Sequence, residues 1–460
     1  MCRLARLHNT RGQQAVKGPG LTNLSPRPNA GRPCIKGAGI PPARLTPLPA
    51  SATLRPAGVL GLSPGLIHPK LHRMFSTSFR LGAVLGINQT ISWGTTFYLP
   101  AIVAAPVAAS FGQSGFAVLG AFSWALLVTG ACAPRVGKWI DHHGGRGALL
   151  ASILVIAAGQ AVLAISHGLV LWYLGWTIIG LGMSMGLYDA AFATVGGLLG
   201  QEAGPSITGI TLVAGFASTV FWTLGAALIG ALEWRGLLLA YACLMLAVNL
   251  PMIWLLIPPA PPRAKQPAET EGLPRSAAHR QALVLLGAFF ALRWFITSAL
   301  AVNALMLFQG IGLTAGQAVG VAALIGPGQV AGRLLEYAIG PRVDIMVKAR
   351  VAAVLLPLGT GLLLLGGPIA ATGFALLYGM SNGVMTINRG TLPLAIFGPH
   401  GYASLLGWLA VPVLLAQATA PTLTAPLMSS LSALNVFLLS GCAAAVAVLF
   451  LMPLRVPGTR

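Results

Sequence analysis

The sequence predicts an all-α polytopic membrane protein of twelve transmembrane helices, arranged as two bundles of six. The first observation is composition: 56% of the 460 residues are apolar and only 8% are charged. Since soluble domains carry about 25% charged residues, this chain lacks the polar surface to cover a soluble core. The second is a series of apolar segments of membrane-crossing length, and the third is an internal repeat. Together they exclude a soluble globular protein and a mostly disordered chain.

The chain begins with a segment unlike the rest. Residues 1–73 are rich in Pro, Gly and Arg, and they hold eleven of the Lys and Arg residues but no acid. They lack the apolar stretch of a secretory signal peptide. We interpret 1–73 as a disordered basic tail without function, or as sequence upstream of a start at Met74. An Arg-rich transit peptide is the less favoured alternative.

Twelve segments are long and apolar enough to cross a membrane, which takes about 20 residues. The six before a central break are 81–104, 115–136, 147–166, 170–197, 207–231 and 236–257. The six after it are 282–308, 315–336, 348–366, 369–396, 402–427 and 431–453. The break, 258–281, has six prolines and six charges, so we expect an aqueous linker there. The expected domains are thus bundles at 74–257 and 282–460.

Basic residues predict the orientation. Those of the body fall on alternate loops that share one side: Arg135, Lys138, Arg146, Arg263, Lys265, Arg275, Arg280, Arg342, Lys348, Arg350, Arg455 and Arg460. The loops of the other side hold only Arg235. Because Lys and Arg concentrate in cytoplasmic loops, we expect both termini and the linker in the cytoplasm, with the protein in a bacterial inner membrane. The scattered cations do not form a nucleic-acid-binding stripe.

Two short segments recur across the linker. Residues 137–141 (GKWID) match 332–336 (GRLLE) at an offset of 195, and 182–186 (GMSMG) match 379–383 (GMSNG) at an offset of 197. Two matches at nearly equal offsets argue for duplicated halves. Parallel repeats of six helices form a known transporter architecture, in which the solute binds near the midplane between the halves.

The segment GKWIDHHGGRG (137–147) resembles the loop signature of the major facilitator superfamily, with Gly137, Asp141, Gly144 and Arg146 in the motif positions and Gly145 as an extra residue. The resemblance extends over 75–455. It implies that Asp141 locks the halves together on the cytoplasmic side. We therefore expect a conformational gate that includes Gly137, Asp141 and Arg146, with Arg333 and Glu336 from the repeated segment. The alternative is that these residues only anchor helix ends and set topology.

Three ionisable residues lie inside predicted spans and away from the loop motifs: Asp189 in span 4, Arg293 in span 7 and Arg389 in span 10. Such residues are costly at membrane depth and are functional candidates by default. The family resemblance implies that spans 1, 4, 7 and 10 line the cavity. We expect Asp189 and Arg389 to pair across the halves and to act in proton coupling or as an inner gate. A static pair is the alternative.

Other side chains on these spans predict a modest polar pocket. Arg293 could bind an anionic group with its planar fork, or could extend along span 7 toward the interface. The expected substrate or cavity residues are Gln89, Trp93, Tyr188, Arg293, Asn303, Asn382, Thr386 and Arg389. Hydrogen bonding between helices is the alternative for each polar residue in this set.

The resulting hypothesis is a secondary transporter that moves a small solute by alternating access, driven by a proton gradient, with a small organic anion as the substrate. Export of a toxic small molecule, such as a drug or a metalloid, is an alternative of the same class. A membrane-embedded enzyme is disfavoured, because no clustered acids or nucleophile–base pair is evident. We expect no catalytic residue, metal or cofactor. The expected partners are the substrate and the lipid bilayer, without nucleic acid or an obligatory protein partner.

Overall fold

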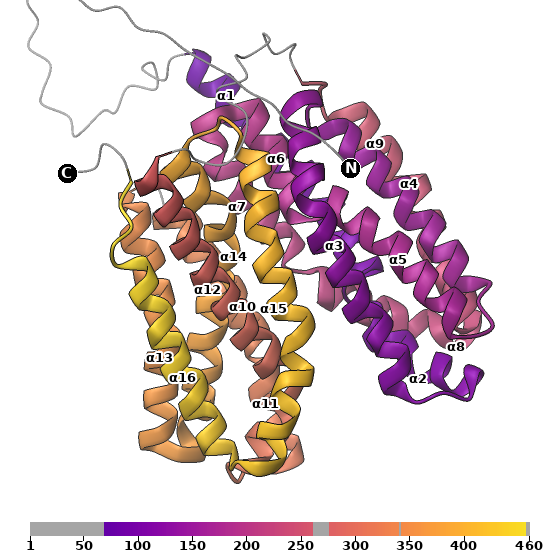
Figure 1. Ribbon diagram of the computed structural model, residues 1–460, viewed down its shortest axis with the longest axis vertical. Coiled ribbons are helices and arrows are strands. Elements are labelled where there is room, and N and C mark those ends of the chain that lie inside the picture. The colour runs from indigo at the N-terminus through magenta and orange to yellow at the C-terminus, as the bar shows by residue number, and fades with distance from the viewer. Residues whose placement is uncertain (1–68, 261–275, 340–341, 457–460) are drawn as a thin grey trace, which may run out of the picture. The chain divides into compact units, whose positions relative to one another are not determined.

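The computed structural model describes residues 69–260, 276–339 and 342–456, and all its regular elements in these ranges are helices (Figure 1). Nine stretches are long and apolar enough to cross a membrane within the described residues. Two of them turn back on themselves: Leu169–Leu256 contains spans 4 to 6, and Ile345–Phe397 contains spans 9 and 10. The nine stretches therefore supply twelve crossings, and the predicted all-α membrane fold is confirmed.

The first six crossings are built from helices α1 to α9, coloured indigo to pink in Figure 1. Crossing 1 consists of α1 (Pro69–Thr95) and α2 (Pro100–Phe111). Crossing 2 is α3 (Gly115–His143), and crossing 3 is α4 (Gly145–Ala164). Crossing 4 consists of α5 (Leu169–Gly186) and α6 (Tyr188–Leu199). The 3₁₀ turn η1 (Gly200–Ala203) leads to α7 (Gly204–Ala214) and α8 (Ala217–Leu244). The helix α8 turns back at Glu233, whose φ is 55°, so α8 serves both crossings 5 and 6. Crossing 6 ends through the π-helix η2 (Met245–Asn249) and α9 (Leu250–Leu256).

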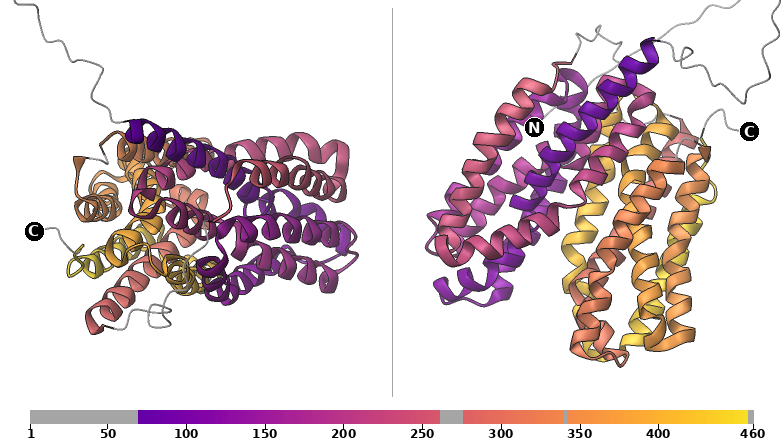
Figure 2. Two further views of the ribbon diagram at one scale, coloured as in Figure 1. Left: turned by 90° about the horizontal axis from the view of Figure 1, so that it is seen from above. Right: turned by 180° about the vertical axis from the view of Figure 1, so that it is seen from behind.

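The last six crossings are coloured brown to yellow in Figures 1 and 2. They are α10 (Ala277–Gly310), α11 (Ala315–Ala323) with α12 (Ile325–Ile339), α13 (Ile345–Gly366), α14 (Ala371–Phe397), α15 (Tyr402–Ser430) and α16 (Ala433–Leu451). The 3₁₀ turn η5 (Gly367–Ala370) joins α13 to α14. We call 69–260 the N half and 276–456 the C half.

Two predicted boundaries are wrong by a few residues. The helix α1 begins at Pro69, inside the segment expected to be a disordered tail, because proline at the first helical position loses no hydrogen bond. The helix α10 begins at Ala277, inside the expected linker, because the Ser276 hydroxyl accepts from the His279 amide and caps the helix. The rest of the tail, 1–68, and linker residues 261–275 lie outside the described residues.

Span 1 is broken where the sequence predicted a continuous helix. Pro100 has no amide hydrogen to continue the helical bonds of α1, so α1 ends at Thr95 and α2 begins with Pro100 at its first position. The break frees the Thr95 carbonyl, which accepts from the Gln160 side chain of α4 at 2.8 Å. An unpaired carbonyl in the membrane costs several kcal/mol, on the order of a lost hydrogen bond, so Gln160 stabilises the break.

The packed core shows on which side the halves close. We call the side of His143, Leu199, Leu256 and Phe397 the inner side; it is the side predicted to be cytoplasmic. The N-half core includes residues of α14 and of the first part of α15: Ile387, Leu394, Tyr402, Ala403, Leu406, Ala410, Leu414 and Ala418. Toward the opposite ends of the C-half helices, the core around Leu307 and Phe374 is made only of C-half residues among those described. The halves are therefore packed together on the inner side.

Candidate functional site

An ion pair joins the two halves inside the predicted cavity. The Arg389 guanidinium, on α14, donates to both carboxylate oxygens of Asp189, on α6, at 3.0 Å from Nε and 2.6 Å from Nη2. This two-pronged geometry is the strongest arrangement for an arginine–carboxylate pair. The Asp189 side chain keeps 23% of its surface exposed and Arg389 keeps 11%, so the pair is only partly withdrawn from the cavity. The pairing that the sequence predicted is present.

Asp189 stands at a break in span 4 that the sequence analysis missed. The helix α5 ends at Gly186 and α6 begins at Tyr188, with Leu187 in an extended conformation between them (φ −81°, ψ −169°). Asp189 therefore lies in the first turn of α6, where the helix dipole favours a negative charge. The run of Gly182, Ser184 and Gly186 was the available signal, since glycine and serine lower helical stability.

Gln89 of α1 holds this break together. Its amide nitrogen donates to the Gly186 carbonyl at 2.7 Å, and its amide oxygen accepts from the Trp93 indole at 3.1 Å. The Gly186 carbonyl would otherwise lack a helical partner, because the chain leaves the helix at Leu187. Gln89 is fully buried and does not line the pocket described below, so it acts by stabilising the helix break.

A pocket with about 460 Å³ of empty space lies beside the ion pair. Its lining combines predicted and new residues from both halves: Trp93, Phe97, Leu126, Thr129, Ala133, Met183, Ser184, Leu187, Tyr188, Asp189, Ala190, Arg389, Leu414 and Gln417. The Trp93 ring packs against Tyr188 at 4.8 Å and against Phe97 at 4.9 Å, measured between ring centres. The pocket is thus largely aromatic and aliphatic, with the ion pair as its charged feature, as small-molecule sites commonly are.

Two predicted C-half residues, Arg293 and Asn382, belong to a second polar cluster that does not line this pocket. Arg293 of α10 is 2% exposed and donates to Thr297 Oγ1 at 2.6 Å, Ser381 Oγ at 3.0 Å and Asn382 Oδ1 at 2.6 Å. The guanidinium also lies 5.8 Å from the centre of the Tyr378 ring. Arg293 therefore does not extend toward the interface, and none of the contacts named here is to a carboxylate.

Two other predicted cavity residues lie apart from the pocket. Thr386 is buried and its hydroxyl donates to the Asn382 carbonyl one turn earlier on α14. The Asn303 amide donates to the Ala299 carbonyl on its own helix, α10. The contacts of both residues are thus hydrogen bonds to helix carbonyls, as in the structural alternative to a role in the cavity.

On the inner side, the Asp141 carboxylate of α3 reaches the first turn of α15 in the other half. It accepts from the Ala403 amide at 3.1 Å and from the Ser404 amide at 2.7 Å. Those amides have no helical carbonyl partner, because they belong to the N-terminal turn. Close backbone packing supports the contact: a Cβ atom on Gly137 would overlap the Ala403 carbonyl.

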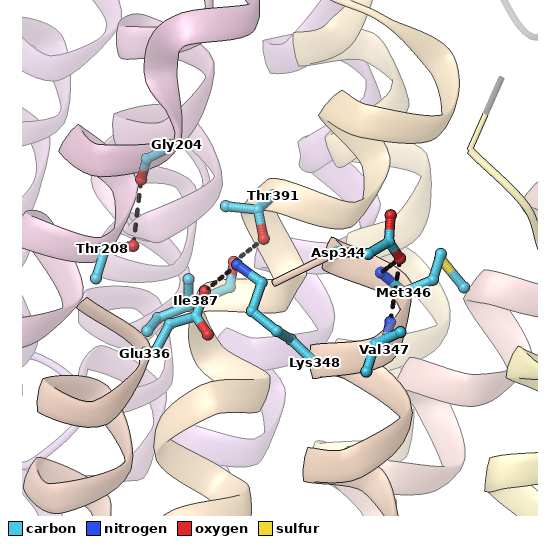
Figure 3. Close-up of polar contacts among 9 residues, drawn as sticks. All are labelled: Gly204, Thr208, Glu336, Asp344, Met346, Val347, Lys348, Ile387 and Thr391. Carbon is cyan, nitrogen blue, oxygen red and sulfur yellow. Dashed lines mark hydrogen bonds and ion pairs between the residues drawn. The ribbon is translucent and has the colours of Figure 1, made fainter. Parts of the chain in front are cut away.

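The other predicted gate residues differ in their partners. Arg146 donates to the Trp254 carbonyl at the end of α9, within the N half. Glu336 of α12 pairs with Lys348 of α13 at 2.7 Å, within the C half (Figure 3). Arg333 lies against Gly215 of the N half, where an added Cβ atom would overlap its Nη1. Three predicted gate residues contact the opposite half: Gly137, Asp141 and Arg333. Arg146 and Glu336 instead bond to residues of their own half.

The sequence matches the Major Facilitator Superfamily over residues 81–409. The chain belongs to this superfamily. A comparison with curated protein sequences found no match.

Solved structures of major facilitators share the fold. The human organic anion transporter MFSD10 (TETRAN) superposes with a TM-score of 0.65 at 19% identity, covering 84% of this chain and 100% of its own. The proton:xylose symporter XylE gives 0.61 at 14% identity, covering 82% and 94%. FucP in its outward conformation gives 0.64 at 15% identity, covering 81% and 98%. The chain is therefore a multi-pass membrane transporter by family.

Several residues of this major facilitator's pocket escaped the sequence analysis. Thr129 and Gln417 come from α3 and α15, outside the four spans on which we sought cavity residues. Thr129 also donates to the Gly180 carbonyl at 2.9 Å, and this contact holds α3 close to α5. The Arg389 guanidinium lies 5.8 Å from the centre of the Trp294 ring. A polar residue in an otherwise apolar span was the signal available for Thr129 and Gln417.

Proposed function

We propose that this major facilitator is a proton-coupled transporter of small organic anions. The observation that carries the proposal is the Asp189–Arg389 pair, which bridges the halves at the wall of the pocket. An anion that binds the two-pronged Nε and Nη2 face of Arg389 must replace Asp189 there. The two carboxylates then compete for one guanidinium unless Asp189 is neutralised.

A proton resolves this competition. Removing the partner of a buried charge costs about 3–5 kcal/mol, so Asp189 released from Arg389 as a carboxylate is a high-energy species. Protonation turns it into a neutral acid that can remain in the same place without a cation. Anion binding to Arg389 and proton binding to Asp189 therefore favour each other. Such cooperativity is what a symporter of an anion and a proton requires.

The same exchange loosens the contact between the halves. In the closed inner side, the Asp189–Arg389 pair is one of the bonds that join α6 to α14. With Asp189 protonated and Arg389 bound to the substrate, that bond no longer opposes separation of the halves. Occupancy of the pocket is thus coupled to opening, as alternating access requires.

The cations of the C half favour an anionic substrate. Arg293 is a buried guanidinium whose named partners are hydroxyl and amide groups, so its positive charge adds to that of Arg389. The structural neighbour MFSD10 is named as an organic anion transporter. At 19% identity that likeness supports the fold, and the proposed substrate class depends on the arginines.

The test uses the full chain in proteoliposomes and a panel of labelled organic anions, with and without an imposed pH gradient. We expect one or more anions to accumulate only with the gradient. Asp189→Asn should abolish gradient-driven accumulation while leaving exchange of labelled for unlabelled anion. Asp344→Asn is the matched control, because Asp344 caps α13 away from the pocket. Accumulation that is the same with and without the gradient would refute proton coupling.

We also propose that the inner side faces the cytoplasm of a bacterial cell. The support is the distribution of Lys and Arg, which favours the loops of that side. Cysteines introduced singly at Lys138, in the last turns of α3 on the inner side, and at Gln113, between α2 and α3 on the opposite side, should react differently with an impermeant maleimide added to intact cells. Labelling of the Lys138 position from outside would reverse the orientation.

A further inference from the structure

The Arg333 side chain is a buried cation without a matching partner. It is 4% exposed, and among the described residues its Nε and Nη1 atoms have no hydrogen-bond partner. The remaining nitrogen, Nη2, has a single long contact of 3.4 Å to Gln329 Oε1 on the same helix. Burying a charged guanidinium without hydrogen bonds is strongly unfavourable, so a group that supplied acceptors here would be bound tightly.

The acids of the predicted pair and gate are engaged with other groups. Asp189 binds Arg389, Glu336 binds Lys348, and Asp141 binds amides of α15. The acid nearest Arg333 in sequence, Glu336, thus serves a different cation. Glu336, which the sequence analysis placed in the gate with Arg333, therefore does not pair with it.

Arg333 lies near a tyrosine that lines the pocket. It lies within electrostatic range of the hydroxyl groups of Tyr98 and Tyr188, and Tyr188 lines the pocket. Arg333 comes from α12 and contacts Gly215 of the N half, whereas the Asp189–Arg389 pair joins α6 to α14. Trp93, Tyr98 and Tyr188 form an aromatic group, in which the Trp93 ring centre lies 6.4 Å from that of Tyr98 and 4.8 Å from that of Tyr188.

We propose that Arg333 is a second anion-binding residue and that the substrate is an organic acid with two negative groups. One group binds Arg389 when Asp189 takes up a proton, and the other binds the Arg333 guanidinium, whose Nε atom has no hydrogen-bond partner among the described residues. The carbon skeleton between them contacts the aromatic group. This inference rests on the proposed function, and it narrows the substrate class from anions to dianions.

The experiment compares succinate and glutarate with their monoamides, succinamate and glutaramate, in binding to the purified full chain and in uptake by proteoliposomes. Each monoamide keeps the length of its parent but has one charge fewer. We expect the wild type to prefer the dianions. Arg333→Gln should weaken dianion binding by about ten- to a hundredfold, the effect of losing hydrogen bonds to a charged group, and should leave monoamide binding nearly unchanged.

A second variant displaces Arg333 without removing its charge. A Cβ atom at Gly215 would overlap Arg333 Nη1, the mobile end of a long side chain, and the backbone at Gly215 (φ −59°) accepts alanine. Gly215→Ala should therefore fold and should also lower the preference for dianions. The control is Arg342→Gln, since Arg342 is exposed and its named bond is to Ala338 of the preceding turn.

Four outcomes separate the hypotheses. Loss of dianion preference in Arg333→Gln and Gly215→Ala, with Arg342→Gln unchanged, supports the inference. An equal loss for dianions and monoamides overturns it and assigns Arg333 to the gate. If the wild type takes up anions without any preference for two charges, this inference fails while the proposed function stands. If it takes up no anion at all, the proposed function fails.

Discussion

Asp141 and Ser404 are joined across the two halves: the Asp141 carboxylate accepts the Ser404 amide at 2.7 Å, at the N-terminal turn of α15. The neighbouring Ala403 amide donates to the same carboxylate. A carboxylate at a helix N-terminus satisfies unpaired amides and interacts favourably with the helix dipole, which together contribute up to about 2 kcal/mol. Because the two partners belong to different halves, this energy stabilises the conformation closed on the inner side.

Asp141→Asn should shift the protein toward the conformation open on the inner side. The Asn side chain has one acceptor oxygen, so it loses one of the two amide hydrogen bonds as well as the full charge at the helix N-terminus. A change of about 1 kcal/mol or more, at least about fivefold in the ratio of the two conformations, is expected. The measurement is the distance distribution between spin labels at the inner ends of α3 and α15. Asp344→Asn is the control, because Asp344 caps α13 within one half. Equal distributions in wild type and Asp141→Asn would contradict the assignment.

How much the sequence predicts depends on the range of the interaction. The twelve crossings and the Asp189–Arg389 pair were predictable, because length, hydropathy and rare charges are local or periodic signals. The break at Leu187 and its bond from Gln89 were not, since Gln89 and Gly186 are 97 positions apart and meet only through packing. Likewise, Glu336 occupies the position of the repeat that corresponds to Asp141, but it pairs with Lys348 of its own half. The repeat therefore predicts where the acid lies in the sequence but not which residue it contacts.

Gln89→Leu should destabilise the N half and disturb the pocket. The substitution leaves the Gly186 carbonyl without its donor and the Trp93 indole without its acceptor, at a cost of about 1–3 kcal/mol for each buried group. Thermal unfolding in detergent should show a lower midpoint than in the wild type. Gln309→Leu, at an exposed position of α10, provides the comparison. A midpoint equal to that of the control would mean that the break in span 4 does not depend on Gln89.

Exchanging the charges of the cross-half ion pair should restore part of its structural role. Asp189→Arg and Arg389→Asp each place like charges together, so both single variants should lose transport. The double variant recreates an opposite-charge pair and should recover closure of the inner side. We expect it to regain closure, measured by cross-linking of cysteines on α6 and α14, more fully than gradient-driven uptake, because the acid now lies on the other half. No recovery of cross-linking would indicate that the pair does not hold the halves together.

Lys348→Gln tests whether proton coupling depends on the Asp189–Arg389 pair in particular or on buried ion pairs in general. The Lys348–Glu336 pair is similarly buried, but both of its residues lie in the C half. Its loss should lower the thermal midpoint by leaving Glu336 without its cation. It should leave the pH dependence of uptake unchanged, because the pair does not bridge the halves or line the pocket. A change in proton coupling equal to that of Asp189→Asn would contradict this distinction.

Gly137→Ala should prevent full closure of the inner side. The added Cβ atom would overlap the Ala403 carbonyl, a backbone atom that cannot move without displacing α15. Gly130→Ala on the same helix is the matched control, since its Cβ atom would meet the Leu414 side chain at 3.4 Å, close to ordinary contact. Both residues are in the helical interior, where alanine is intrinsically preferred over glycine, so helix propensity changes alike in the two variants. Spin-label distances between α3 and α15 should lengthen in Gly137→Ala only. If both variants close as the wild type does, the tight approach of α3 to α15 is not what limits closure.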